Sequence, residues 1–248
     1  MNFQTMLLDI KGMLVSKRAA YTIIIMALFA VTIALVVEFS PEGLKAALEA
    51  AKPEGSAGVF EFIWFEDFLK FLLLVLISFG AFIICDLEDE EALGLMLARP
   101  ESRLSFLVRR TLSSVISFLI IFTIGTLVAG GIAWAIVGGL NPPVFLLHHL
   151  MIMPMLLFVF SLTFFFSVAL RTTTYTVLAG FAASLMLSFT YSFALMADPG
   201  SEPSILNPLA FGYRVMAGMP LANAFYVVLA LTIVMFTAGG VWFSRKDI

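Results

Sequence analysis

Long apolar runs separated by short polar intervals dominate this chain of 248 residues. Six of these runs come close to the roughly 20 residues that a helix needs to cross a bilayer. The expected spans cover about residues 21–37, 68–87, 113–137, 144–170, 175–196 and 221–243. The pattern therefore predicts an all-α integral membrane protein with six transmembrane helices in a single domain, residues 1–248.

Residues 1–18 follow a different pattern, in which apolar side chains recur every three or four positions. They are Phe3, Met6, Leu7, Ile10 and Leu14, and the basic residues among them are Lys11, Lys17 and Arg18. An apolar stripe beside basic residues is typical of a helix that lies in the membrane interface. We expect an N-terminal interfacial amphipathic helix here, and the alternative is a plain cytoplasmic tail.

The longest charged interval, residues 86–110, lies between the second and third apolar runs. Its acids come first, so a helix starting near Asp86 would carry negative charge in its first turns, as the helix dipole favours. Apolar residues recur on one side of this helix at Leu93, Met96, Leu97 and Leu104. Pro100 then bends or ends the helix. The pattern predicts a short amphipathic helix that docks on a soluble partner, and the alternative is a solvated loop.

An even number of spans places both termini on the same side of the membrane, and the basic residues indicate which side. One face carries ten bases, namely Lys11, Lys17, Arg18, Arg99, Arg103, Arg109, Arg110, Arg171, Arg245 and Lys246. The other face carries Lys45, Lys52, Lys70 and Arg214. The positive-inside rule makes the first face cytoplasmic. We therefore expect a multi-pass protein of the cell membrane with N- and C-termini in the cytoplasm.

The interval before the second span mixes aromatic and acidic residues, as in the aromatic belt at a membrane interface. Its aromatic residues are Phe60, Phe62, Trp64 and Phe65, and Glu61 lies among them. Farther along the chain, Pro154 predicts a kink near one end of the fourth span. Both features are expected on the face opposite the termini.

Composition narrows the possible classes of protein and partner further. The chain is 61% hydrophobic and 12% charged, whereas soluble domains carry about 25% charged residues. A net charge of −3 without a long basic tract makes nucleic acid an unlikely partner. Cys85 is the only cysteine, so no intrachain disulfide forms.

Several kinds of chemistry are disfavoured by residues that the sequence lacks. No Asp, Glu, Lys or Arg lies in the middle of a predicted span, which argues against a self-contained proton-driven carrier. The chain also has no GxxxxGK[ST] motif, so any ATP that drives it must be bound by another chain. Glu90 and Glu91 begin like the Glu-Glu-x-x-x-Arg motif of prenyl-protein proteases, but Leu95 stands where the arginine would be. We therefore expect no catalytic residues.

Two further groups of residues are candidate sites. Soft sulfur and imidazole suit copper, and they gather near the start of the fourth span at His148, His149, Met151, Met153 and Met155. Methionine is also an ordinary filler of apolar helices, and we expect no metal site. Hydroxyls on the fifth span at Ser184, Ser188 and Tyr191 are candidates for a translocation path, although hydroxyls also join helices to one another.

Residues 93–103, LGLMLARPESR, resemble the leucine-rich run ending in Arg-Pro-x-Ser-Arg of the ABC-2 type permease family. The ending Phe243-Ser244-Arg245-Lys246-Asp247-Ile248 is similar to the basic-pair-then-Asp ending of those subunits. Asn207-Pro208 ahead of Tyr213-Arg214 looks like their segment before the last span. One departure is Glu91-Ala92, where many members have Gly-Thr.

The resemblance implies a permease subunit of an ABC transporter, and specifically an exporter. It implies a cytoplasmic coupling helix between spans two and three that docks on a separate ATPase subunit. The segment that would do so contains Glu90, Glu91, Leu93, Met96, Leu97, Arg99, Pro100 and Arg103. Two permease subunits, as a homodimer or heterodimer surrounded by lipid, would pair with two ATPase subunits that bind the ATP. The alternatives are a membrane assembly subunit without its own path and, less favoured, an intramembrane enzyme.

Overall fold

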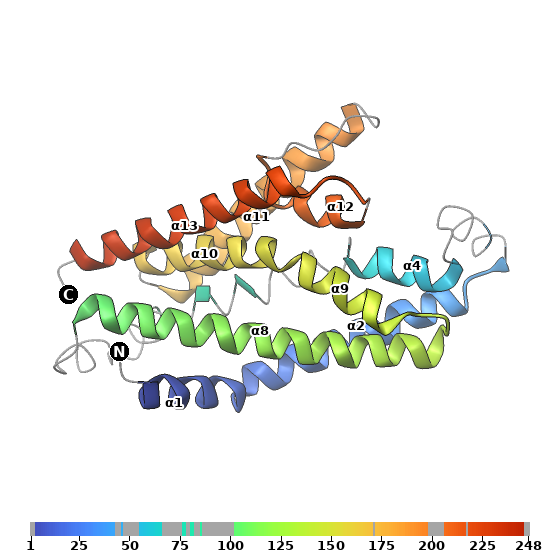
Figure 1. Ribbon diagram of the computed structural model, residues 1–248, viewed down its shortest axis with the longest axis horizontal. Helices are drawn as coiled ribbons and strands as arrows, with labels where there is room; N and C mark the ends of the chain where they lie inside the picture. The colour runs from blue at the N-terminus through green and yellow to red at the C-terminus, as the bar shows by residue number, and fades with distance from the viewer. Residues whose placement is uncertain are drawn as a thin grey trace.

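The computed structural model describes residues 3–42, 46, 55–65, 76–77, 80–81, 85, 102–170, 172–197, 206–216 and 218–245. Within these ranges the regular structure is helical, and its long helices run along one shared axis (Figure 1). The helices are α1 (Phe3–Leu14), α2 (Lys17–Glu38), α4 (Gly55–Ile63), α8 (Arg103–Ile136), α9 (Pro142–Met151), α10 (Met153–Leu170), α11 (Thr173–Ala197), α12 (Ala210–Met216) and α13 (Ala222–Arg245).

Five of these segments are long and apolar enough to cross a membrane: Lys17–Glu38, Arg103–Ile136, Pro142–Leu170, Thr173–Thr190 and Ala222–Arg245. They match the first predicted span and the third to sixth. The all-helical character is therefore confirmed for the described residues, and the five candidate spans fit a protein embedded in a membrane. The second predicted span, residues 68–87, lies almost entirely outside them, so the count of six stays a prediction.

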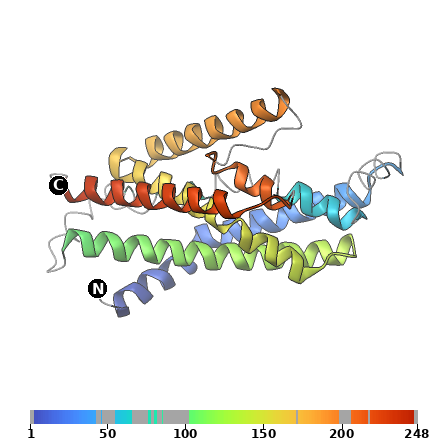
Figure 2. The ribbon, with the colours of Figure 1, turned by 45° about the horizontal axis from the view of Figure 1, so that its top comes forward.

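The bundle has two ends that differ in what they carry. The base, as we call it, holds α1, the start of α8 and the end of α13, and the far end holds α4, α9 and α12 (Figure 1). Both chain termini lie at the base. In the turned view, α1 and α11 lie at opposite edges of the bundle (Figure 2). This layout agrees with the expectation that both termini share one side of the membrane.

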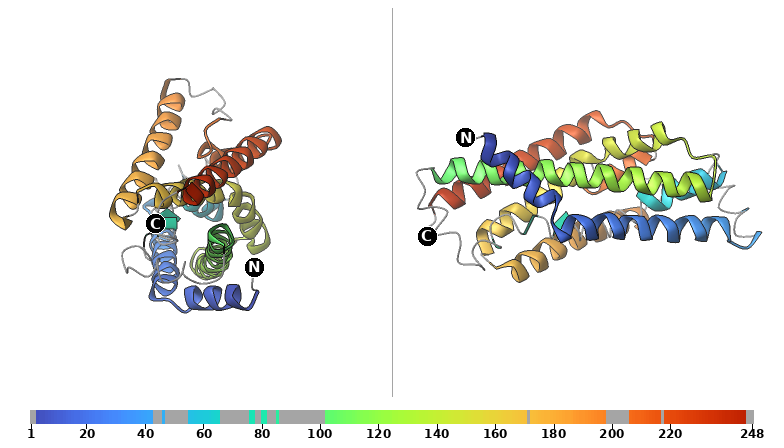
Figure 3. Two further views of the ribbon diagram at one scale, coloured as in Figure 1. Left: turned by 90° about the vertical axis from the view of Figure 1, so that its left-hand side faces the viewer. Right: turned by 90° about the horizontal axis from the view of Figure 1, so that it is seen from below.

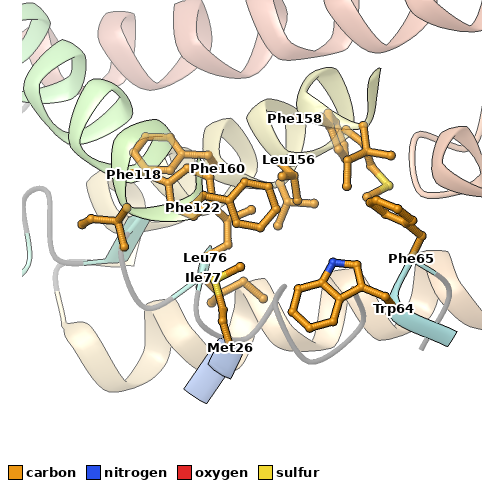
Figure 4. Close-up of a cluster of buried hydrophobic side chains, with 14 of the residues drawn as sticks. Met26, Trp64, Phe65, Leu76, Ile77, Phe118, Phe122, Leu156, Phe158 and Phe160 are labelled. Atoms are coloured by element: carbon orange, nitrogen blue, oxygen red, sulfur yellow. The ribbon is translucent and has the colours of Figure 1, made fainter. Parts of the chain in front are cut away.

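Helix α10 lies in the middle of the bundle and is its most buried span. It is apolar on all sides, as expected of a helix that packs on several neighbours. Phe118 and Phe122 of α8 stack on each other with ring centroids 5.5 Å apart, and Phe118 lies 6.3 Å from Phe160 of α10 (Figure 4). These rings belong to one continuous core that joins α2, α8, α10 and α13.

Small residues set how closely the helices approach one another. A Cβ on Gly239 of α13 would lie 2.6 Å from the ring of Phe164 on α10, so this crossing needs a glycine. Gly125 of α8 faces Met26 of α2 in the same way. Close packing at these crossings is therefore built into α8 and α13.

The fourth span is interrupted as Pro154 predicts. Helix α9 ends at Met151, and α10 restarts at Met153 with Pro154 as its second residue. Proline is tolerated in the first turn of a helix, because the N–H that it lacks would have no partner within the helix there. The interruption lies two residues before the proline and leaves α9 and α10 as one broken span.

The expectation of an interfacial aromatic belt is wrong for Phe60, Trp64 and Phe65. All three are at most 2% exposed and belong to the core cluster. Phe60 and Trp64 stack with ring centroids 6.0 Å apart, and both lie close to Phe145 of α9. The short helix α4 therefore packs into the bundle, because its aromatic face finds partners on α9 and does not need the lipid interface.

Candidate functional site

The predicted coupling segment falls mostly outside the described residues. This applies to Glu90, Glu91, Leu93, Met96, Leu97, Arg99 and Pro100. Its last member, Arg103, is the exposed first residue of α8. The preceding Ser102 caps the helix, since its side-chain oxygen accepts a hydrogen bond from the backbone N–H of Ser105 at 3.2 Å. The chain thus enters α8 through a capped helix start at the end of the predicted docking segment.

An ion pair ties α1 to the base of α8. The carboxylate of Asp9 pairs with Arg109, whose side chain is 6% exposed, and it lies 3.9 Å from a guanidinium nitrogen of Arg110. The guanidinium of Arg109 also lies 5.5 Å from the centre of the Phe106 ring. Removing one partner of such a buried pair would leave an uncompensated charge, so the contact fixes the position of α1.

Apolar and neutral contacts complete the junction between α1 and α8. Met6 and Ile10 are buried, whereas Phe3, Leu7 and Leu8 on the same helix are exposed. Viewed along the bundle, α1 runs across its base beneath α8 (Figure 3). The predicted amphipathic helix therefore exists, with one face on α8 and an apolar face left uncovered.

The candidate path residues lie on α11 in different surroundings. Ser184 is 4% exposed, and its hydroxyl has no hydrogen-bond partner among the described residues. Ser188, one turn farther, is half-buried, and the side chain of Tyr191 lies outside the described residues. Gly180, one turn before Ser184, faces the bundle, because a Cβ there would lie 3.0 Å from Ile77. The serine side of α11 thus faces protein.

A buried polar cluster occupies the far end of the bundle. Glu61 of α4 is 4% exposed, and its Oε2 lies 3.2 Å from Nδ1 of His148 on α9. The next residue, His149, is fully buried, and its ring lies 2.8 Å from the hydroxyl of Thr126 on α8. Phe122 stacks on His149 with centroids 3.9 Å apart. The cluster therefore joins α4, α8 and α9 through polar side chains.

Aromatic rings enclose this cluster. Phe65 meets His148 edge-on at 6.0 Å between centroids and lies 6.4 Å from His149. Phe65 also lies 5.4 Å from Phe145, which contacts Phe60. His149 is thereby enclosed, whereas the side chain of His148 is 25% exposed, so the contact between Glu61 and His148 lies at the edge of the aromatic shell.

Sequence reasoning missed Glu61, because it counted acids only within the predicted spans. The signal was present in the helical spacing of Phe60, Trp64 and Phe65 around a single acid.

The suspected copper ligands are not one group, since Met155 is buried in the core and Met151 is exposed. Among the described residues no cluster of three or more His, Cys, Asp or Glu side chains occurs. The absence of a metal site stays a prediction.

Comparisons with known proteins add no family assignment. No family model matches the chain, and no curated protein sequence matches it significantly. The resemblance of residues 93–103 to a permease motif therefore stays an expectation.

Proposed function

We propose that this chain is the permease subunit of an ATP-driven ABC transporter of the ABC-2 type, working as an exporter with a separate ATPase subunit. The observation that carries the proposal is α8, which starts at Arg103, the last residue of the predicted docking segment, and continues without a break to Ile136. Its 34 residues correspond to about 50 Å at the usual helical rise. A single rigid rod thus reaches from the docking segment through the bilayer.

The junction with α1 supports this role for α8. A force applied at the docking segment enters α8 at Ser102 and Arg103, and Asp9 holds α1 to the same helix less than two turns farther on. Movement of α8 would therefore carry α1 with it across the base of the bundle. Such coupling suits a subunit that is driven from outside the membrane.

The energy source would be a partner, since this chain has no phosphate-binding loop. The apolar side of the docking helix, Leu93, Met96 and Leu97, would insert into a groove of the ATPase. Glu90 and Glu91 would face basic residues at the rim, and Arg99 and Arg103 acidic ones. Two permease subunits would pair with two ATPase subunits in the cell membrane, with both termini in the cytoplasm.

The translocation path would include the serine side of α11. Ser184 supports this choice, because its hydroxyl is buried and lacks a partner among the described residues, so a polar substrate group could satisfy it. Ser188 lies one turn away on the same face, and Tyr191 follows on the same helix. The path is part of the proposal and does not depend on the metal or the histidine cluster.

The decisive experiment changes the docking helix and nothing in the membrane. Leu97→Asp should release the ATPase, because burying an unpaired carboxylate costs several kcal/mol. Glu101→Gln should change little, because a charge at the rim of an interface tunes association without holding the complex together. The measurements are co-purification of the ATPase from native membranes and substrate-stimulated ATP hydrolysis in reconstituted vesicles.

The controls separate docking from folding. Both variants should insert and purify as the unchanged subunit does, and the purified subunit alone should hydrolyse no ATP. Full partner retention and turnover by Leu97→Asp would mean that the segment only links two spans. Purification of the native protein without any ATP-binding chain would favour an assembly subunit instead.

A further inference from the structure

An apolar groove of about 650 Å³ runs along the base half of the bundle. Three helices form its walls: α8 contributes Leu104, Val108 and Leu112, α10 contributes Leu157 and Phe164, and α13 contributes Phe236, Gly240, Val241 and Ser244. All three belong to candidate membrane spans. The volume is within the roughly 300–1,000 Å³ of small-molecule sites. The groove therefore offers space for an apolar chain within the hydrocarbon layer.

One wall residue carries a polar group without a partner. The hydroxyl of Thr111 is buried and makes no hydrogen bond within the described residues. Threonine in a helix usually satisfies its hydroxyl on the carbonyl one turn earlier, as Thr123 does on Leu119 at 2.8 Å. An unmade hydrogen bond in a low-dielectric site destabilises the fold. A ligand with an acceptor at this depth, such as an ester carbonyl, would remove that destabilisation.

An exposed basic residue flanks the base end of the groove. Arg245 directly follows the lining residue Ser244, and Asp247 follows two residues later. Within α8, α10 and α13 themselves the sequence contains no Asp or Glu. Basic residues at the membrane surface attract anionic lipid.

We propose that this groove binds a phospholipid with an anionic headgroup. One acyl chain lies between α8 and α13, the hydroxyl of Thr111 meets the ester region, and Arg245 binds the phosphate. This order of apolar, weakly polar and basic groups along the groove matches the order of parts in a phospholipid. The proposal stands apart from the transport function, since a bound lipid would stabilise the subunit whether or not it transports.

Gly240 allows a direct test. A Cβ added there would meet nothing within 4 Å and Gly240 lines the groove, so Gly240→Phe places a ring in the groove. Gly131 is a matched control, because it is also helical, exposed and without neighbours within 4 Å, and it lies on α8 beyond the groove. Native mass spectrometry of the detergent-purified protein, titrated with phosphatidylglycerol, measures lipid binding. We expect Gly240→Phe to weaken binding at least tenfold and Gly131→Phe to leave it unchanged.

A second variant guards against a folding defect in Gly240→Phe. Val108→Phe narrows the groove from the opposite wall, where the valine is 43% exposed, and should weaken binding similarly. Equal affinity of either variant and the unchanged protein, or loss of binding in Gly131→Phe as well, would overturn the proposal. The proposal would also be overturned if a second copy of the chain occupied the groove. That outcome would be seen as a dimer that Gly240→Phe dissociates.

The headgroup is tested separately. Phosphatidylcholine, which has no net charge, should bind the unchanged protein severalfold more weakly than phosphatidylglycerol. Arg245→Gln should remove that preference and keep the remaining acyl-chain binding, whereas Lys17→Gln at the start of α2 should keep the preference. Equal binding of the two lipids by the unchanged protein would contradict the anionic specificity.

Discussion

The two ends of the bundle bury charge in different ways. At the base, the carboxylate of Asp9 meets Arg109 and Arg110, side chains that stay positively charged. At the far end, the carboxylate of Glu61 lies 3.2 Å from Nδ1 of His148, a partner of a different kind. The base therefore holds an ion pair with guanidinium groups, whereas the far end holds a contact between a carboxylate and an imidazole.

The surroundings of the two pairs reinforce this difference. Asp9 is 21% exposed and joins a helix at the membrane surface to the base of a span. Glu61 is 6% exposed in its side chain and lies within aromatic rings. The pair at the base ties α1 to α8, and the pair at the far end ties α4 to α9. The comparison is tested by breaking each pair in turn.

The largest effect is expected at the base. Asp9→Asn removes the carboxylate that pairs with the buried guanidinium of Arg109 and should cost about 3 kcal/mol of the free energy of unfolding. The measurement is the melting temperature in detergent, which should fall by several degrees. Lys11→Gln on the same helix is the control and should change it little, since Lys11 is exposed.

A double variant separates lost attraction from the charge left behind. Asp9→Leu with Arg109→Met removes both charges and should recover most of the stability lost in Asp9→Asn. Equal melting temperatures for Asp9→Asn and the unchanged protein would show that the pair does not hold α1 to α8.

How far the sequence predicted this molecule depends on whether a feature is local. Apolar runs are local features, so the first predicted span and the third to sixth coincide with five candidate membrane helices. The break expected at Pro100 is local too, whereas the cap at Ser102 that starts α8 was not predicted. The pairing of Asp9 with Arg109 joins residues 100 positions apart, and no pattern in either segment predicts it.

Glu61 shows the same limit for the candidate site. Its sequence neighbourhood of aromatics and acids fits a membrane interface as well as a buried helix. Burial is decided by Phe145 and His148 on α9, which lie more than 80 positions away in the chain. A residue placed by tertiary contacts is therefore assigned to the wrong environment when hydropathy alone is used.

A smaller effect is expected at the far end. Glu61→Gln keeps the size of the side chain and one acceptor for His148, so it should cost about 1 kcal/mol of the free energy of unfolding. Glu42→Gln is the control, because Glu42 is exposed near the end of α2. The measurement is the melting temperature in detergent at pH 6 and pH 8. A loss as large as that of Asp9→Asn would mean that the far end holds an ion pair as well.

The smallest effect is expected for metal. Replacing His148 and His149 together with Ala removes the imidazoles from the far end, but their partners are Glu61 and Thr126, side chains that satisfy them by hydrogen bonds. The double variant should therefore bind the same amount of copper and zinc as the unchanged protein, measured by elemental analysis after purification without chelators. Its melting temperature should fall, because Phe122 loses the ring that stacks on it. Thr123→Val, which leaves both histidines in place, is the control for metal content. Loss of one equivalent of copper or zinc in the double variant alone would show that the far end is a metal site. The two ends of the bundle would then differ in that one holds a metal centre and the other an ion pair.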